Sequence, residues 1–421
     1  MKVFKFGGAS VSNLERVSLV NDILKGYPGE KILVVISAMG KTTNALEKVA
    51  EAFYSGNNKE ALGLFESIKE QHLDTAKKLL IKSFNETYPL LVDIFTEVEW
   101  LLHDKPVRGY DYYYDQIVCT GELLSTCIMS ACFIDNGIPN KWIDVRDILR
   151  TDDNFRDVAI DFNYVEAKIS DEVLPFFKTF DIIVTQGFIG STDENESTTL
   201  GREGSDYTAA VFANLLNASG LTIWKDVEGV MNADPRHFPE AVFISHLNYN
   251  EVIEMAYYGA QVIHPKTIKP LQNKHIPLYV KCFLDKNLPG TIIDDNPIQQ
   301  LPPIIVVKQN QALVHFHTKD FSFAGEKPLA LLYNLLAEHH IQANLLQTGA
   351  VRIDICIDDK ADKIEKLALS ASELFDVQVE KNLSMLTIRH YRDDLLQKLS
   401  NGKRIRLRQQ SPETVQLVMH D

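Results

Sequence analysis

The sequence predicts an α/β protein with a parallel sheet over its first 290 residues, followed by a smaller unit of ferredoxin-like strand order. Short β-branched runs alternate in the first part with longer amphipathic segments, which is the pattern of a parallel sheet covered by helices. The clearest strand-like runs are residues 32–36, 182–185, 221–225 and 276–280. Residues 44–103 are predicted to be a helical excursion from this sheet, because their apolar residues recur at helical spacing.

A proline-rich stretch that holds Pro289, Pro297, Pro302 and Pro303 suits a linker better than a packed element. Beyond it, the chain reads as strand, helix, two strands, helix and strand, the ferredoxin-like βαββαβ order, with Pro328 at the first helix start. A second copy begins but lacks its last helix. We therefore expect a large domain over 1–290, a linker and strand over 291–310, a βαββαβ domain over 311–381 and a truncated copy over 382–421.

Composition and charge narrow the classes of partner. The 421 residues are 45% hydrophobic and 24% charged, as in ordinary globular proteins, and carry a formal net charge of −14. This sign opposes attraction to nucleic acid or to anionic membranes, so we expect neither as a partner. Lys5 interrupts the amino terminus before the apolar core of a secretion signal can form, and no apolar run approaches the roughly 18 residues of a membrane span.

The five cysteines predict buried thiols in a reducing cytoplasm. They are odd in number and contain no C-x-x-C pair. The twelve histidines are scattered along the chain rather than clustered near cysteines. We therefore expect no metal ion held by these side chains.

Glycine-rich turns after strand-like runs are the first candidates for a binding site, because such turns meet at one edge of a parallel sheet. Lys5, Gly7 and Gly8 end or follow the opening strand. Glycines let backbone amides approach a phosphate, and the lysine supplies positive charge. Taken alone, a plain strand-to-helix turn explains these residues equally well.

A second segment favours a functional interpretation more strongly. Arg202 lies between two glycines, and Ser205 and Asp206 open an alanine-rich helix. A helix cap explains Ser205 and Asp206 but not the arginine, which suits bidentate capture of a carboxylate or phosphate. A carboxylate at a phosphate site needs a cation as its partner, and Lys5 is a candidate for Asp206.

Three further segments leave alternatives open. Glu122 is either an exposed helix cap or a partner for an ammonium group, and Thr43 is either a polar group over the sheet edge or a simple cap. Lys225 and Asp226 lead through a turn to a cation, Arg236. His264, which precedes a proline, is interpreted as a structural turn residue rather than as a catalytic base.

Together, these segments resemble aspartate kinase over almost the whole chain. The motifs that carry the resemblance are K-F-G-G-A-S at Lys5, T-G-E at Thr120, T-Q-G-F-I-G at Thr185, G-R-E-G-S-D at Gly201, W-K-D-V-x-G at Trp224, D-P-R at Asp234 and G-A-Q-V-I-H-P at Gly259. The resemblance implies an amino-acid-kinase αβα sandwich followed by two ferredoxin-like ACT regulatory domains, the second of which is shortened here.

The resemblance also implies an activity, the transfer of the γ-phosphoryl group of Mg-ATP to the β-carboxylate of L-aspartate. This reaction is the first step towards lysine, threonine and methionine. The implied catalytic residues are Lys5 and Asp206, and the implied aspartate-binding residues are Thr43, Glu122, Arg202 and Ser205. The implied nucleotide-binding residues are Lys5, Phe6, Gly7, Gly8, Lys225, Asp226, Met231, Arg236, Gln261 and Val262. Mg²⁺ would be held mainly through the phosphates, with no protein ligand.

Several features depart from the family pattern. Relatives commonly carry lysine at the position of Gln261 and tyrosine at that of Met231, so phosphate neutralisation falls more heavily on Lys5 and Lys225. Glu203 stands where glycine is frequent, and we expect its side chain to point away from the substrate. The family suggests a cytoplasmic homodimer with an amino acid effector at the ACT domains, but the loop 347–350 offers little charge to hold a lysine ammonium group. The alternatives are a non-catalytic sensor of ATP and amino acids and a kinase of another small carboxylate.

Overall fold

The computed structural model describes residues 1–260, 262–298, 300–320 and 322–420, which form two compact units. The first unit contains residues 1–230, 243–253 and 262–298. The second contains the described residues of 231–242, 254–261 and 299–421.

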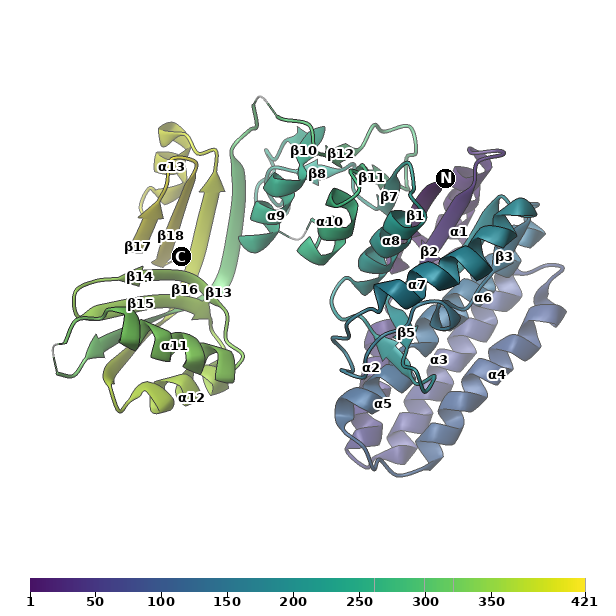
Figure 1. Ribbon diagram of the computed structural model, residues 1–421, viewed down its shortest axis with the longest axis horizontal. Coiled ribbons are helices and arrows are strands. Elements are labelled where there is room, and N and C mark those ends of the chain that lie inside the picture. Colours follow the sequence, from purple (N-terminus) through teal and green to yellow (C-terminus); the bar gives the residue numbers. More distant parts are fainter. Residues whose placement is uncertain (261, 299, 321, 421) are drawn as a thin grey trace. The chain divides into compact units, whose positions relative to one another are not determined.

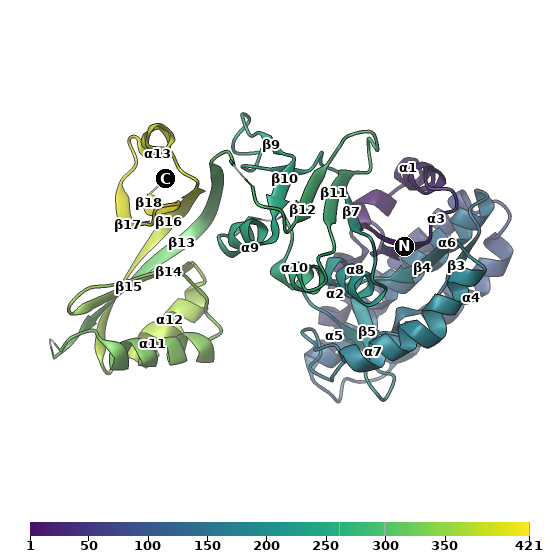
Figure 2. The same ribbon diagram turned by 45° about the horizontal axis from the view of Figure 1, so that its top comes forward.

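A largely parallel eight-stranded sheet is the frame of the first unit (Figures 1 and 2). Among the described residues, its strands in spatial order are β10 (His246–Asn248), β12 (Thr291–Asp294), β11 (Leu278–Cys282), β7 (Leu221–Lys225), β1 (Lys2–Phe6), β2 (Ile32–Ile36), β4 (Ile182–Gln186) and β3 (Asn140–Trp142). Every neighbouring pair is parallel except β11 with β12. The predicted α/β class is confirmed.

Helices cover both faces of this sheet. Phe4, Phe6 and Ile36 point to one face, where they share a core with α1 (Leu14–Lys25), α5 (Tyr110–Val118) and α6 (Thr120–Asp135). On the other side, α8 (Gly204–Leu215) packs on β1, β2 and β7, and α10 (Pro265–Gln272) packs on α8. Smaller elements complete the first part of the chain: α7 (Phe162–Lys168), β5 (Ile189–Ser191), β6 (Ser197–Thr199), β8 (Val230–Met231), β9 (Phe243–Ile244) and α9 (Tyr249–Tyr257).

The predicted helical excursion is confirmed as three consecutive helices, α2 (Thr42–Tyr54), α3 (Asn58–Leu79) and α4 (Phe84–His103) (Figure 1). Each contacts the next or the central helix α6 through apolar side chains. Phe65 and Phe95, for example, meet edge to face with ring centroids 6.1 Å apart. The excursion therefore extends the hydrophobic core of the sheet instead of forming a separate one.

One expectation about apolar runs is wrong. Within the described residues, Tyr110–Asp135 is long and apolar enough to cross a membrane by length and composition, although the sequence analysis expects no such run. The most apolar part of this segment is 94% buried inside the protein. Residues 120–133 of helix α6 are all buried, because the sheet and neighbouring helices surround the helix, which is the pattern of a core helix.

The second unit contains a six-stranded antiparallel sheet in the order β14-β15-β13-β16-β18-β17 among its described residues. Its elements along the chain are β13 (Ile304–Thr318), α11 (Glu326–Glu338), β14 (Ala343–Thr348), β15 (Arg352–Asp358), α12 (Ala361–Ala371), β16 (Phe375–Arg389), α13 (Asp393–Ser400), β17 (Ile405–Gln410) and β18 (Thr414–His420). The βαββαβ order is confirmed, although α11 begins two residues before Pro328.

The stretch predicted as a linker is partly a strand of the larger sheet. Thr291–Asp294 forms β12, whose residues alternate between buried and more exposed, and the Thr291 hydroxyl donates to the carbonyl of Ile244. Strand β13 then begins at Ile304. The prolines at 289, 297, 302 and 303 lie outside both strands, where the loss of a backbone donor costs no ladder hydrogen bond.

All five cysteines are buried and unpaired, as predicted.

Candidate active site

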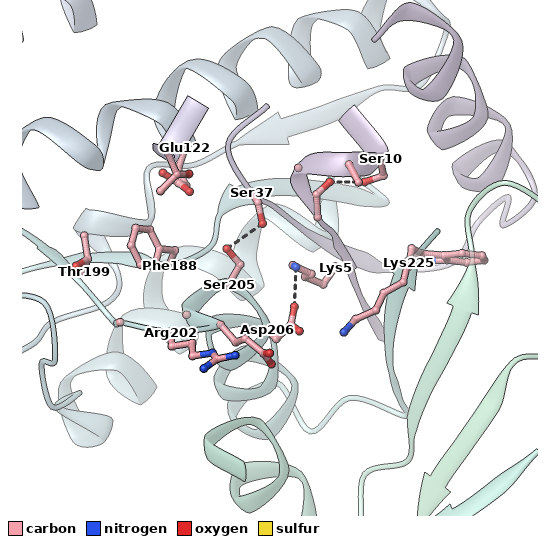
Figure 3. Close-up of a pocket in the computed structure, with 18 of the residues that line it drawn as sticks. Lys5, Ser10, Ser37, Glu122, Phe188, Thr199, Arg202, Ser205, Asp206 and Lys225 are labelled. Carbon is pink, nitrogen blue, oxygen red and sulfur yellow. Dashed lines mark hydrogen bonds and ion pairs between the residues drawn. The ribbon is translucent and has the colours of Figure 1, made fainter. Parts of the chain in front are cut away.

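A cleft of about 790 Å³ lies in the first unit and is lined by the ends of its central strands (Figure 3). Strands β1 and β7 are neighbours in register, with Phe6 opposite Trp224, so the residues that follow them emerge at the same edge. The described residues that line the cleft include ten predicted site residues: Lys5, Gly7, Gly8, Thr43, Glu122, Arg202, Ser205, Asp206, Lys225 and Asp226. Tertiary structure thus brings together residues as far apart in the chain as Lys5 and Asp226.

Lys5 and Asp206 form a buried ion pair in this cleft. The Lys5 Nζ lies 2.6 Å from Asp206 Oδ1, and the two side chains are only 12% and 4% exposed. Burial by itself raises the pKa of Asp206, but the charges of Lys5 and Lys225 outweigh it and hold this pKa below the usual value for an aspartate. Asp206 is therefore a carboxylate at neutral pH, and it fixes the position of the lysine amine.

The glycine loop after β1 packs tightly against the loop after β2. A Cβ atom at Gly8 would lie 2.6 Å from the Ala38 carbonyl oxygen and 2.9 Å from that of Gly40. These are backbone atoms that cannot swing aside, so only glycine permits the approach. The Ser10 hydroxyl donates to the Gly7 carbonyl at 2.6 Å and closes the turn.

Glu122 is a buried carboxyl group with an unmet hydrogen-bonding capacity. It lies in the first turn of α6 and is 2% exposed. Its Oε1 accepts a hydrogen bond from the Ala38 amide at 3.3 Å, while its Oε2 has no partner among the described residues. Burial raises the pKa of Glu122 to about 8. The exposed-cap alternative is therefore wrong, and a cation placed in the cleft would satisfy this oxygen.

Arg202 and Ser205 flank the start of α8. Arg202 is exposed between Gly201 (φ +73°) and Glu203 (φ +54°), and no carboxylate among the described residues forms an ion pair with it. The Ser205 hydroxyl lies 3.0 Å from that of Ser37, which follows β2 (Figure 3). Arg202 is thus a cation open to an anionic ligand.

Other predicted residues have mixed outcomes. The Lys225 Nζ donates to the Val262 carbonyl at 2.7 Å, so these two are neighbours. Phe6 is fully buried with its ring stacked on Trp224, so its side chain does not line the cleft. Met231 and Arg236 belong to the second unit, where Arg236 pairs with Asp234 at 2.6 Å. Gln261 lies outside the described residues.

His264 and Glu203 have structural contacts. The His264 ring accepts from the Lys266 amide at the start of α10, in agreement with its interpretation as a turn residue. Glu203 lies in the cleft lining, and its carboxylate accepts a hydrogen bond from the backbone N–H of His264 at 2.9 Å.

Several lining residues were not predicted as site residues, although Ser10, Phe188 and Trp224 lie within the motifs at Lys5, Thr185 and Trp224. They are Ser10, Ser37, Glu47, Tyr114, Arg156, Phe188, Thr199, Trp224 and Phe283. Phe188 has a left-handed backbone (φ +73°), and its Cδ2 would lie 2.7 Å from a Cβ at Gly204, so glycine there makes room for the ring. Positive φ at a phenylalanine is the kind of signal that points to a site, but it is invisible in the sequence.

Comparisons with known proteins agree with this geometry. Residues 1–282 match the amino acid kinase family. The lysine-sensitive aspartokinase 3 of Escherichia coli is 30% identical over 403 residues, which cover 92% of this chain and 86% of that protein. The chain belongs to the aspartokinases of the amino acid kinase family.

Solved structures of E. coli aspartokinase III extend this likeness to the fold. The complex of that enzyme with aspartate and ADP (R-state) superposes with a TM-score of 0.85 at 27% identity, covering 100% of this chain and 96% of that one. Its complex with lysine and aspartate (T-state) gives 0.81 at 27% identity, covering 99% and 95%. The chain spans about a third of another curated relative, the chloroplastic bifunctional aspartokinase/homoserine dehydrogenase 1 of Zea mays (34% identity over 302 residues, 71% of this chain and 32% of that protein).

The burial of Glu122 predicts a pH dependence of stability in the ligand-free protein. The folded pKa of about 8 lies above the unfolded value of 4.5, so between these values the folded state binds more protons. Stability contributed by this group is therefore full below about pH 4.5 and is lost as pH rises towards 8, by roughly 1 kcal/mol per pH unit. Glu122→Gln should remove this slope.

Urea unfolding at pH 5 and pH 8 measures the effect, since the difference between wild type and Glu122→Gln cancels the other titrating groups. Glu86→Gln, at an exposed position in the first turn of α4, is the control. Equal pH slopes for wild type and Glu122→Gln would contradict the assignment.

Proposed function

We propose that the cleft of this aspartokinase transfers the γ-phosphoryl group of ATP to the β-carboxylate of L-aspartate and gives 4-phospho-L-aspartate and ADP. One observation carries the proposal: a buried lysine–aspartate pair beside a glycine loop shares one cleft with an open arginine and an unsatisfied buried carboxyl group. The lysine–aspartate pair and the glycine loop suit a phosphate chain. The arginine and the buried carboxyl group suit the α-carboxylate and α-ammonium groups of an amino acid.

The reaction needs no general base. An aspartate side chain has a pKa of about 3.9 and is ionised at pH 7, so its oxygen attacks the γ-phosphorus directly. The bond from that phosphorus to the bridging β,γ-oxygen breaks, and ADP leaves with the electron pair. What the protein must supply is alignment and neutralisation of charge on the transferring group.

We assign a role to each residue, and its position in the cleft supports the assignment. Lys5, oriented by Asp206, contacts the transferring phosphate, while Gly7 and Gly8 let the backbone approach the phosphate chain. Lys225 adds a second positive charge, and Asp226 and Val262 lie beside it. We assign Met231, Arg236 and Gln261 to the nucleotide by family resemblance alone. We assign Mg²⁺ to the substrate, where the phosphates of ATP hold it.

The amino acid end holds aspartate by its two α-substituents. Arg202 takes the α-carboxylate, because no protein carboxylate among the described residues neutralises it. Glu122 takes the α-ammonium group, and that cation lowers the pKa of Glu122 and releases its proton on binding. Thr43 and Ser205 complete the pocket with their hydroxyl groups.

The second unit supports a regulatory assignment. We infer that 311–381 and 382–421 are ACT domains, the second shortened, which follow a catalytic domain over 1–290 and a connection over 291–310. The βαββαβ order of β13 to β16 supports this inference. We also infer a cytoplasmic homodimer that takes an amino acid effector at these domains.

The experiment that tests the activity is an acyl-phosphate trap. The protein is incubated with Mg-ATP and aspartate in the presence of hydroxylamine, and the hydroxamate is measured. Glutamate, N-acetylglutamate and carbamate serve as alternative acceptors in the same assay. UMP forms no acyl phosphate, so its phosphorylation is measured by the release of ADP. We expect aspartate hydroxamate alone. Hydroxamate from another acceptor would assign a different carboxylate kinase, and ATP binding without any product would assign a sensor.

Replacing Lys5 by Met should reduce kcat by roughly 10²–10³-fold or more, the effect of removing one preorganised electrostatic contact. Lys2→Met, which alters a lysine of the same strand that pairs with Glu30 at the surface, should change kcat less than twofold. The Lys5 variant leaves Asp206 buried without its cation, so circular dichroism must establish that it folds. Near-normal turnover in folded Lys5→Met would remove Lys5 from the mechanism.

Lysine should inhibit this enzyme weakly or not at all. The loop 347–350 is exposed and uncharged, and the next charged side chain, Arg352, is ion-paired with Asp354 at 2.5 Å, so this segment offers no free carboxylate to a lysine ammonium group. Activity is measured against lysine, with threonine as a comparison effector. Half-maximal inhibition by lysine below 1 mM would refute this prediction.

A further inference from the structure

Arg156 lines the cleft, yet neither its sequence context nor the roles above account for it. Its backbone is left-handed, with φ +71°, a conformation that residues other than glycine seldom adopt. Its side chain is 45% exposed. Glycine would adopt the same turn without strain, so an arginine at this position of the cleft wall indicates a function for its side chain.

A buried carboxylate fixes this residue in place. Asp115 of α5, which is fully buried, accepts hydrogen bonds from the Arg156 amide at 3.0 Å, the Thr199 amide at 2.9 Å and the Thr199 hydroxyl at 2.6 Å. Both Arg156 and Thr199 line the cleft. Hydrogen bonds to a buried carboxylate therefore hold the left-handed turn.

The guanidinium group of Arg156 is positioned by an aromatic ring, but its charge is neutralised only by an exposed carboxylate. It lies over the Tyr114 ring at 4.3 Å from the centroid, and the Tyr114 hydroxyl donates to Glu47 at 2.7 Å. Its ion partner is Asp111, at 2.9 Å, whose side chain is 58% exposed. An exposed pair of this kind is worth little and exchanges readily for another anion.

Arg156 belongs to the amino acid end of the cleft. A Cβ at Gly201 would lie 2.9 Å from the Arg156 carbonyl oxygen, so the turn that carries Arg156 touches the turn that carries Arg202. The two arginines thus come from adjoining turns of one wall. The phosphate cations Lys5 and Lys225 come instead from the sheet strands β1 and β7.

We propose that Arg156 is a second substrate-binding cation. Its guanidinium group separates from Asp111 and, together with Arg202, binds the α-carboxylate of the amino acid. This inference rests on the proposed function, because it takes aspartate as the ligand of that end. The β-carboxylate is not its partner, since that group must face the γ-phosphate. Tyr114 holds the guanidinium plane, and Asp115 holds the turn.

The first test replaces Arg156 by Gly, which suits a φ of +71° and keeps the fold. The KM for aspartate should rise about tenfold, the low end for a charge-assisted hydrogen bond at a half-exposed site, with kcat and the KM for ATP within twofold of wild type. Arg156→Lys should recover part of the loss, because it keeps the charge but loses the planar fork.

Arg108→Ala is the matched control. Arg108 is also 45% exposed, pairs with Glu196 and lies over the Tyr112 ring at 3.9 Å, but it does not line the cleft. It should leave the KM for aspartate within twofold of wild type. If Arg156→Gly behaves like Arg108→Ala, the inference is overturned and the Arg156 contacts are structural only.

A double-mutant cycle with Asp111 separates binding from a merely structural ion pair. Asp111→Asn releases the guanidinium group from its competitor and should lower the KM for aspartate two- to fivefold. In the Arg156→Gly background, the same change should have no effect. An equal decrease in both backgrounds would show that Asp111 acts on the substrate directly and would overturn the proposed exchange.

The wild-type hydroxamate assay distinguishes the two levels of failure. Turnover of aspartate by wild type with an unchanged KM in Arg156→Gly rejects the role of Arg156 and leaves the activity standing. No aspartate hydroxamate from wild type rejects the proposed function and this inference with it.

Discussion

The buried pair of Lys5 and Asp206 is the interaction on which the rest of the site depends. Two charges are taken almost completely out of water, which is unfavourable unless they meet in good geometry. That geometry comes from a central strand and from the first turn of the helix that packs on it. The core beneath both elements is therefore as necessary to the site as the charged groups themselves.

Two carboxyl groups in one cleft show how environment decides protonation. Asp206 and Glu122 are both buried, yet the pKa of the first is lowered and that of the second is raised to about 8. Asp206 has a lysine amine at 2.6 Å, whereas Glu122 has one amide at 3.3 Å and an oxygen without a partner among the described residues. Asp206 is satisfied by a lysine of the protein itself, whereas Glu122 can be satisfied only by a cation on a ligand.

The second unit is unified by two long strands. In β13, residues 304–308 pair with residues 385–389 of β16, while residues 311–318 pair with residues 375–383 of the same strand. The βαββαβ unit and the shortened copy after it thus share one antiparallel sheet. A copy that lacks a helix can still bury its strands, because residues 304–308 of β13, which precede the βαββαβ unit, supply the missing neighbour.

The local chemistry of the chain could be predicted from its residues. Periodicity indicated the parallel sheet, the helical excursion and the βαββαβ order, and the motifs shared with aspartate kinases indicated ten residues that line the cleft. These features are local, since each depends on spacing along a strand, a helix or a turn. The resemblance to aspartate kinases depends on the same motifs.

Only the tertiary structure decided which distant groups meet and how deeply they are buried. The contacts of Arg156 with Asp115 and Tyr114, the unmet oxygen of Glu122 and the left-handed turn at Phe188 leave no pattern in the sequence. Strand β12 was also not predicted, because it lies in a proline-rich stretch that suits a linker. The apolar segment Tyr110–Asp135 is assigned to the core because it is buried in the folded protein. Burial, charge pairing and backbone strain are properties of the packed chain, because they depend on neighbours that only folding brings together.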